Sequence, residues 1–115
     1  MLVKMDLFNQ VNGYNEKVKI DFCDFQFLEK VRQYNDKFCL INSIALQDFS
    51  NFEHSSEKQR IRFLQYLEDA YNCEKPAFTD KLGFLYTVTR HALGLTVKLK
   101  SMSFLGLYIN NYLIR

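Results

Sequence analysis

The sequence has no long apolar run. Its first residues, MLVKMDLF, are interrupted by Asp6 before they reach the length of a signal-peptide core, so we expect no export. Residues 101–114 form the most apolar stretch, but Asn110 and Asn111 lie within it. The stretch is also shorter than the roughly 18 apolar residues of a membrane-spanning helix. The sequence therefore predicts no interaction with a membrane.

Tryptophan is absent, and cysteine and proline are scarce. Cys23, Cys39 and Cys73 are odd in number and widely spaced, which suits a reducing compartment, so we expect a cytoplasmic protein. No Cys or His pair has the spacing of a structural zinc site, and we predict neither a metal nor a cofactor. Pro76 lies in no Gly/Ser/Pro-rich linker, so we expect one compact domain over residues 1–115.

The sequence also shows no arrangement of residues typical of a catalytic site. Cys23 lies between two acidic residues and Cys73 ends a predicted helix, so neither thiol is expected to be activated. Glu68 and Asp69 are adjacent on a helix and therefore point in different directions, which disfavours a shared acid-base role. The four glycines are too scattered for a phosphate-binding loop. We therefore predict that the protein is not an enzyme.

Aromatic residues are abundant. Eleven Phe and seven Tyr make up 16% of a 115-residue chain, and so small a domain cannot bury every ring. Exposed aromatic rings commonly anchor protein interfaces. The sequence thus favours a small protein-binding module of the inhibitor, immunity, antitoxin or adaptor type, whose partner is another protein or a second copy in a homodimer. The predicted binding residues are Phe49, Phe52, Tyr66 and Tyr86.

Apolar residues with helical spacing predict four helices, at residues 2–13, 25–36, 57–72 and 80–93. Ser56 and Gln59 have capping-box spacing at the start of the third helix, and Thr79 is placed to cap the fourth. Gly94 is a typical residue to end the fourth helix, because glycine adopts positive φ easily.

Strict alternation of apolar and polar residues predicts strands at residues 17–22 and 95–100. Asn110 and Asn111 are typical of the turn of a final hairpin. The expected fold class is therefore α+β, with about four helices and a small, mainly C-terminal β region. The alternative is an all-α bundle in which residues 25–47 and 97–113 are each one helix.

The segment RHALGLTVKLK, residues 90–100, resembles the turn of a helix-turn-helix. Arg90, Lys100 and Ser103 stand where that motif needs small or apolar residues, so we reject it. A weaker nucleic-acid hypothesis remains. Residues 76–115 contain five Lys or Arg against one Asp or Glu, whereas residues 1–75 contain ten against twelve. The candidate phosphate-binding residues are Arg90, His91, Lys98 and Lys100.

Overall fold

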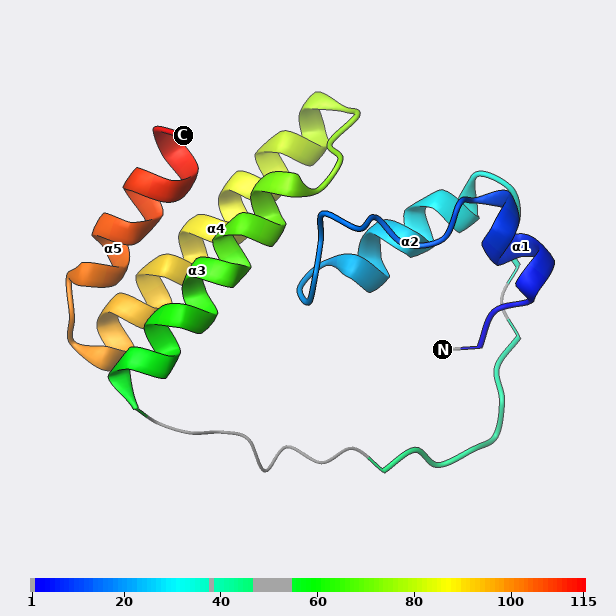
Figure 1. Ribbon diagram of the computed structural model, residues 1–115, viewed down its shortest axis with the longest axis horizontal. Helices are drawn as coiled ribbons and strands as arrows, with labels where there is room; N and C mark the ends of the chain where they lie inside the picture. The colour runs from blue at the N-terminus through cyan, green and yellow to red at the C-terminus, as the bar shows by residue number, and fades with distance from the viewer. Residues whose placement is uncertain (1, 38, 47–54) are drawn as a thin grey trace.

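The computed structural model describes residues 2–37, 39–46 and 55–115, and within these ranges it is helical and contains no β-strand. The predicted α+β class is therefore wrong, and the all-α alternative is the one that fits. The elements are α1 (Met5–Gln10), α2 (Cys23–Arg32), α3 (Ser56–Asn72), α4 (Phe78–Leu99), α5 (Ser103–Tyr108) and the π-helical turn η1 (Ile109–Leu113). Figure 1 shows α3, α4 and α5 side by side, with α1 and α2 beyond them.

The main core lies where α3, α4 and the C-terminal helical segment meet. On α4, Phe84, Val88 and Ala92 recur every four residues, so their side chains share one face of the helix. This face packs against buried residues of α3 and α5; the whole buried set is Val18, Phe63, Leu67, Ala70, Cys73, Phe84, Val88, Ala92, Phe104 and Tyr108. On the opposite face of α4, Leu82, Tyr86 and Val97 are exposed.

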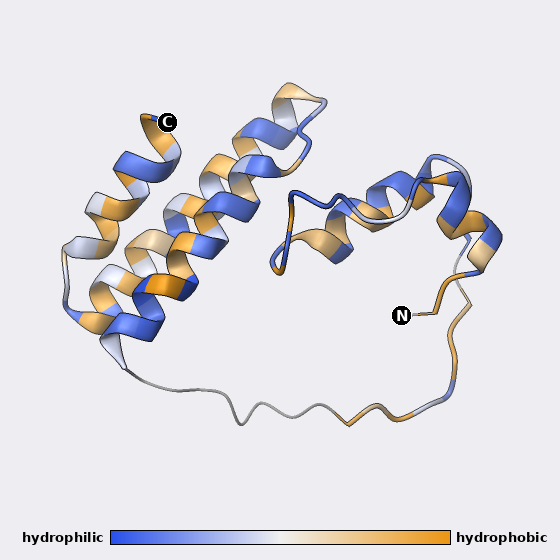
Figure 2. Ribbon diagram, in the orientation of Figure 1, coloured by the Kyte–Doolittle hydropathy of each residue, from blue (hydrophilic) through white to orange (hydrophobic). Residues whose placement is uncertain are grey.

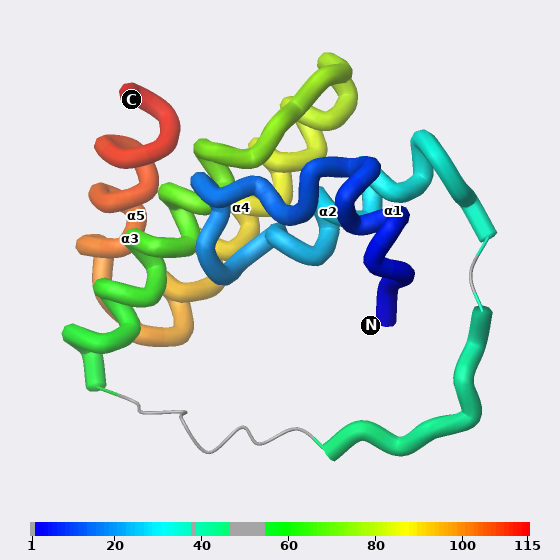
Figure 3. Tube along the Cα trace, turned by 45° about the vertical axis from the view of Figure 1, so that its right-hand side comes forward, coloured from blue at the N-terminus to red at the C-terminus, as the bar shows by residue number. Residues whose placement is uncertain are grey.

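A second, smaller cluster joins α1 to α2. Phe27 and Val31 of α2 are buried against Val11, with apolar residues of α1 packed around them. Gly13, at φ +62, forms the turn after α1, and a Cβ added there would meet the ring of Phe8 at 2.9 Å. Figure 3 shows the start of α2 beside α4, where Phe25 contacts Phe84 edge to face.

The strand predicted at residues 17–22 is not formed. Val18 is buried in the main core, but Ile20 is mostly exposed, so the alternating apolar residues do not share one buried face. A strand also needs a neighbouring strand to accept its backbone hydrogen bonds. Here the amides of Lys19, Ile20 and Asp21 donate to the side chain of Asp69 instead.

The second predicted strand is the last part of α4, and Gly94 lies inside the helix instead of ending it. Leu95 and Leu99 are partly buried against the core, because residues four apart share a helix face. The same two residues also fit an alternating pattern, which explains the error. The helix ends at Lys100, whose φ is +50, and the amide of Ser101 donates to the carbonyl of Thr96 at 3.2 Å.

The predicted C-terminal hairpin is also wrong, since Asn110 and Asn111 lie in η1. Phe104 and Tyr108 are buried one helical turn apart, and Tyr112 continues that stripe. Asn111 donates through Nδ2 to the carbonyl of Leu107 at 2.9 Å, so its side chain supports the helix. The non-helical residues after α4 also divide residues 97–113 between the end of α4 and the continuous segment of α5 and η1.

The other boundaries differ locally. The cap of α3 is Ser55, one residue before the predicted Ser56, and its hydroxyl accepts from the amide of Lys58 at 3.3 Å. At the start of α4, the carboxylate of Asp80 accepts from the amide of Ala77, and Thr79 is not the cap.

The alternative helix over residues 25–47 is not formed either, because α2 ends at Arg32. Residues 39–46 have no regular secondary structure and are exposed. Figure 2 shows the apolar character of this extended segment, in which Leu40 is 98% and Leu46 97% exposed.

Candidate functional site

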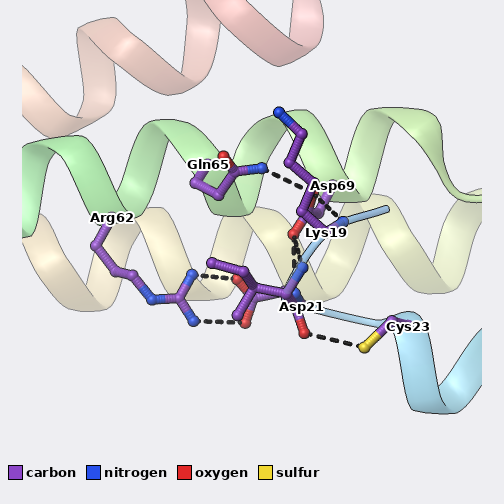
Figure 4. Close-up of polar contacts among 7 residues, drawn as sticks. Lys19, Asp21, Cys23, Arg62, Gln65 and Asp69 are labelled. Atoms are coloured by element: carbon purple, nitrogen blue, oxygen red, sulfur yellow. Dashed lines mark hydrogen bonds and ion pairs between the residues drawn. The ribbon is translucent and has the colours of Figure 1, made fainter. Parts of the chain in front are cut away.

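A buried carboxylate on α3 fixes the segment that precedes α2. Asp69 is fully buried, and its Oδ2 accepts from the amides of Ile20 at 2.9 Å and Asp21 at 2.8 Å. Its Oδ1 accepts from the amide of Lys19 at 3.0 Å and from Gln65 Nε2 at 2.9 Å (Figure 4). Four donors thus satisfy a buried charge, and the segment is held against α3.

The electrostatics of this clamp favour the ionised carboxylate. Burial raises the pKa of Asp69, but the hydrogen bonds from the three amides and from Gln65 outweigh it, and the net pKa is below the ordinary aspartate value. Beside the clamp, Arg62 forms a two-bond ion pair with Asp21 (Figure 4). The hydrogen bond to Asp21 is the main cause of the raised pKa of Arg62.

The clamp positions two phenylalanines over α4. Phe22, immediately after the clamped residues, has a left-handed backbone at φ +63, which costs a non-glycine residue about 1 kcal/mol. Its ring centroid lies 5.1 Å from that of Tyr66 and 5.2 Å from that of Phe84. Phe25, one turn later, meets Phe84 edge to face at 6.3 Å. The clamp therefore supports an aromatic wall along one side of α4.

Between this wall and α4 lies an open groove of about 350 Å³, lined mainly by apolar atoms. Its lining residues are Phe22, Phe25, Thr79, Asp80, Gly83, Phe84 and Thr87. No described atom lies within 4 Å of a Cβ placed on Gly83, so the missing side chain leaves space that nothing in the described chain fills. We call this cavity the aromatic groove.

An exposed apolar row on α4 adjoins the aromatic groove. Leu82, Tyr86, Leu93 and Val97 are 49%, 67%, 48% and 77% exposed, respectively. Their spacing of four, seven and four residues places them on one side of the helix, opposite the buried stripe of Phe84, Val88 and Ala92. We call these four residues the outer row. Four such residues on one side of a helix are informative, whereas single exposed apolar residues are common on any protein surface.

The predicted binding residues are distributed unevenly over the structure. Tyr86 belongs to the outer row. Tyr66 is only partly exposed, because its ring packs between Phe22 and Phe63 and lies 4.5 Å from the ring of His91. Phe49 and Phe52 lie outside the described residues.

The candidate phosphate-binding residues do not gather on one face. Residues two apart are separated by about 200° around a helix, so Lys98 and Lys100 point to different sides, whereas a strand would have aligned them. Arg90 is exposed on α4. The ring of His91 rests against Tyr66 and Phe63, and burial lowers its pKa, with a further lowering by Arg62 that attraction to Asp21 opposes.

Sequence reasoning missed Asp69, Phe22 and Gly83. No local pattern marks Asp69 as a clamp, because its donors come from residues about fifty positions earlier. Gly83 could have been found from the sequence. A glycine inside a strongly periodic helix lowers stability, and it therefore indicates a position where close packing or binding requires a missing side chain.

Among residues 2–37, 39–46 and 55–115, no three His, Cys, Asp or Glu side chains form a group able to hold a metal ion. In the same residues, no helix combines the length and apolar character that crossing a membrane requires.

Comparison of the chain with protein-family models, with curated proteins and with solved structures gives no match.

Proposed function

We propose that the protein is a non-enzymatic binding module for another protein, of the inhibitor, immunity, antitoxin or adaptor type, acting in the cytoplasm. The outer row and the aromatic groove together form its binding surface. The observation that carries this proposal is that four large apolar side chains on one side of α4 are about half or more exposed, beside an open groove whose lining includes three phenylalanines.

The shape of this surface suits a helix. α4 has 22 residues and is therefore about 33 Å long, and the outer row follows it through four turns. An amphipathic helix recognises such a surface through apolar residues at positions i, i+4 and i+7. Tyr86 supplies the kind of large side chain that anchors interfaces, and the aromatic groove accepts a side chain from the partner.

The nucleic-acid hypothesis gains no support from the placement of its residues. Lys98 and Lys100 lie on different sides of the end of α4, and the ring of His91 packs against aromatic residues. The protein-binding surface is therefore the function that the geometry favours.

Affinity capture from a native lysate tests the proposal. The baits are the wild-type protein, the double variant Tyr86→Ser/Leu93→Ser and the control Ile61→Ser, which removes a similarly exposed apolar side chain from α3. We expect a stoichiometric protein bound to the wild type and the control and lost from the double variant, with all three melting curves closely similar.

The proposal fails if all three baits capture the same proteins. It also fails if none captures a stoichiometric protein and light scattering shows that the wild type is monomeric.

A further inference from the structure

We infer that the protein bound by the outer row is a second copy of this chain, with the two α4 helices packed antiparallel about a twofold axis between Thr89 and Arg90. This inference rests on the proposed binding surface and names its occupant. It is carried by the symmetry of the outer row, by the position of two glycines, by charge and by exposed area.

The outer row is symmetric about the middle of α4. Leu82 precedes the midpoint between Thr89 and Arg90 by as many residues as Val97 follows it, and the same holds for Tyr86 and Leu93. In an antiparallel pair with this register, Leu82 of one copy faces Val97 of the other, and Tyr86 faces Leu93. A twofold axis requires such self-complementarity, because each residue contact occurs twice with the partners exchanged.

Gly83 and Gly94 flank the outer row, because each directly follows one of its members, Leu82 or Leu93. Each lies inside α4, where glycine costs about 1 kcal/mol relative to alanine, and no described atom lies within 4 Å of a Cβ placed on either. Packing among the described residues thus gives no reason for these glycines. In the antiparallel register, Val97 of the second copy lies one residue from the position opposite Gly83, and Tyr86 one residue from the position opposite Gly94, so the missing side chains leave room beside these large ones.

The charges on α4 favour the antiparallel arrangement over the parallel one. Asp80 lies in the first turn of α4, whereas Lys98 and Lys100 lie at its end. Antiparallel packing places Asp80 of one copy at the same end of the pair as these lysines of the other, and it also opposes the two helix dipoles. Parallel packing would bring like lysines together.

Arg90 sets a limit on the affinity. It is exposed and lies next to the axis, so the arginines of the two copies approach each other. This repulsion is screened in solvent, and it weakens the contact without blocking it.

The exposed area reaches the size of a weak dimer interface. The outer row, with Phe78 and Leu85 beside it, exposes roughly 600 Å² per copy if a large side chain offers about 170 Å². Both copies together then approach ~1,200 Å², the lower limit of stable interfaces. We therefore expect a monomer–dimer equilibrium with a dissociation constant in the micromolar range.

Sedimentation equilibrium of the purified full chain tests the occupant. We expect the wild type and Ile61→Glu to dimerise with similar constants, and Tyr86→Glu/Leu93→Glu to dimerise at least about tenfold more weakly. Arg90→Ser is expected to tighten the dimer. Asp80→Lys and Lys98→Glu/Lys100→Glu should each weaken the dimer, and combining the three substitutions should restore it. If Asp80→Lys acted only by removing the cap of α4, the added glutamates would not restore the dimer.

Disulfide trapping tests the register, with every variant also carrying Cys39→Ser to remove the exposed native cysteine. Arg90→Cys, next to the axis, is expected to cross-link with itself. Val97→Cys is expected to cross-link with Leu82→Cys when the two proteins are mixed, but not with itself. Efficient self-cross-linking of Val97→Cys would overturn the antiparallel arrangement.

The remaining outcomes separate this inference from the proposed function. A dimer that Tyr86→Glu/Leu93→Glu leaves intact uses another face, which overturns the inference. The wild type could instead be monomeric at every concentration and capture a partner that Tyr86→Ser/Leu93→Ser does not capture. That result overturns the inference that the partner is a second copy, and it supports the proposed binding surface. A monomer that captures no partner overturns both.

Discussion

The carboxylate of Asp69 in α3 accepts a 2.8 Å hydrogen bond from the backbone amide of Asp21, 48 residues earlier in the chain. This contact joins the N-terminal helices to the bundle. It also sets the direction in which Phe22 and Phe25 leave the clamp, and these rings form one wall of the aromatic groove.

Replacing Asp69 with alanine is expected to lower the free energy of unfolding by about 3 kcal/mol, because three amides and Gln65 lose their acceptor in a largely buried site. Urea denaturation followed by circular dichroism measures the change. Glu68→Ala, at the exposed neighbouring position, is the control and should leave the urea midpoint nearly unchanged. Equal losses for the two variants would contradict the clamp.

The same carboxylate predicts a pH dependence. The pKa of Asp69 is lower in the folded protein than in the unfolded chain, so the unfolded chain binds its proton first as the pH falls. The stabilisation is complete above the unfolded value of about 4 and is lost as the pH falls through the lower folded value. Thermal melts between neutral pH and about pH 3 should therefore show a smaller acid-dependent loss for Asp69→Asn than for the wild type.

Lys100→Gly is expected to stabilise the protein by about 0.5–1 kcal/mol, because Lys100 ends α4 with a φ of +50, which glycine adopts without steric cost. Lys98→Gly, within the last turn of the helix, should instead destabilise it by a similar amount. Chemical denaturation of both variants gives the two signs. A loss of stability in Lys100→Gly would contradict the conformation described for this position.

Gly83→Ala and Gly94→Ala are each expected to raise the free energy of unfolding by about 1 kcal/mol, since the added methyl groups meet no described atom. The measurement is made at a protein concentration where the wild type is monomeric, so that only the helix is tested. Destabilisation by either substitution would show that the glycine serves packing within the chain.

The cysteines are expected to differ in reactivity. Burial raises the pKa of Cys73 to about 11, so its thiol is protonated as well as buried at neutral pH. Cys39 is exposed. Iodoacetamide at pH 8 should therefore modify Cys39 in the folded protein and Cys73 only after denaturant is added, as peptide mass spectrometry would show. Equal rates at both positions in the folded protein would contradict the burial of Cys73.

Helices with strong periodicity could be predicted from the sequence, but the end of α4 could not. The helical spacing of apolar residues placed α3 within one residue of its actual start and located most of α4. Gly94 was a poor guide to the end of α4, because glycine permits a left-handed turn without requiring one. The true end at Lys100 depends on a backbone conformation that lysine rarely favours.

The candidate binding surface was predicted only in part. The excess of aromatic residues predicted that some rings are exposed, and Tyr86 is one of them. Composition alone could not distinguish Tyr86 from Tyr66, whose ring packs against Phe22 and Phe63. The aromatic groove depends on Phe22 and Phe84, which are far apart in the sequence. Gly83 lines this groove only because Phe22 packs against Phe84 beside it.

The sequence by itself determined the helical periodicity of α3 and α4 and the surplus of aromatic side chains, because both follow from local spacing and composition. Only the tertiary structure decided that Lys17–Phe22 is not a strand and that Leu95–Leu99 continues α4. The amides of Lys19, Ile20 and Asp21 need acceptors, and whether another strand or the carboxylate of Asp69 supplies them depends on which segments meet in space. Leu95 and Leu99 fit either period, and the core they pack against selects the helix.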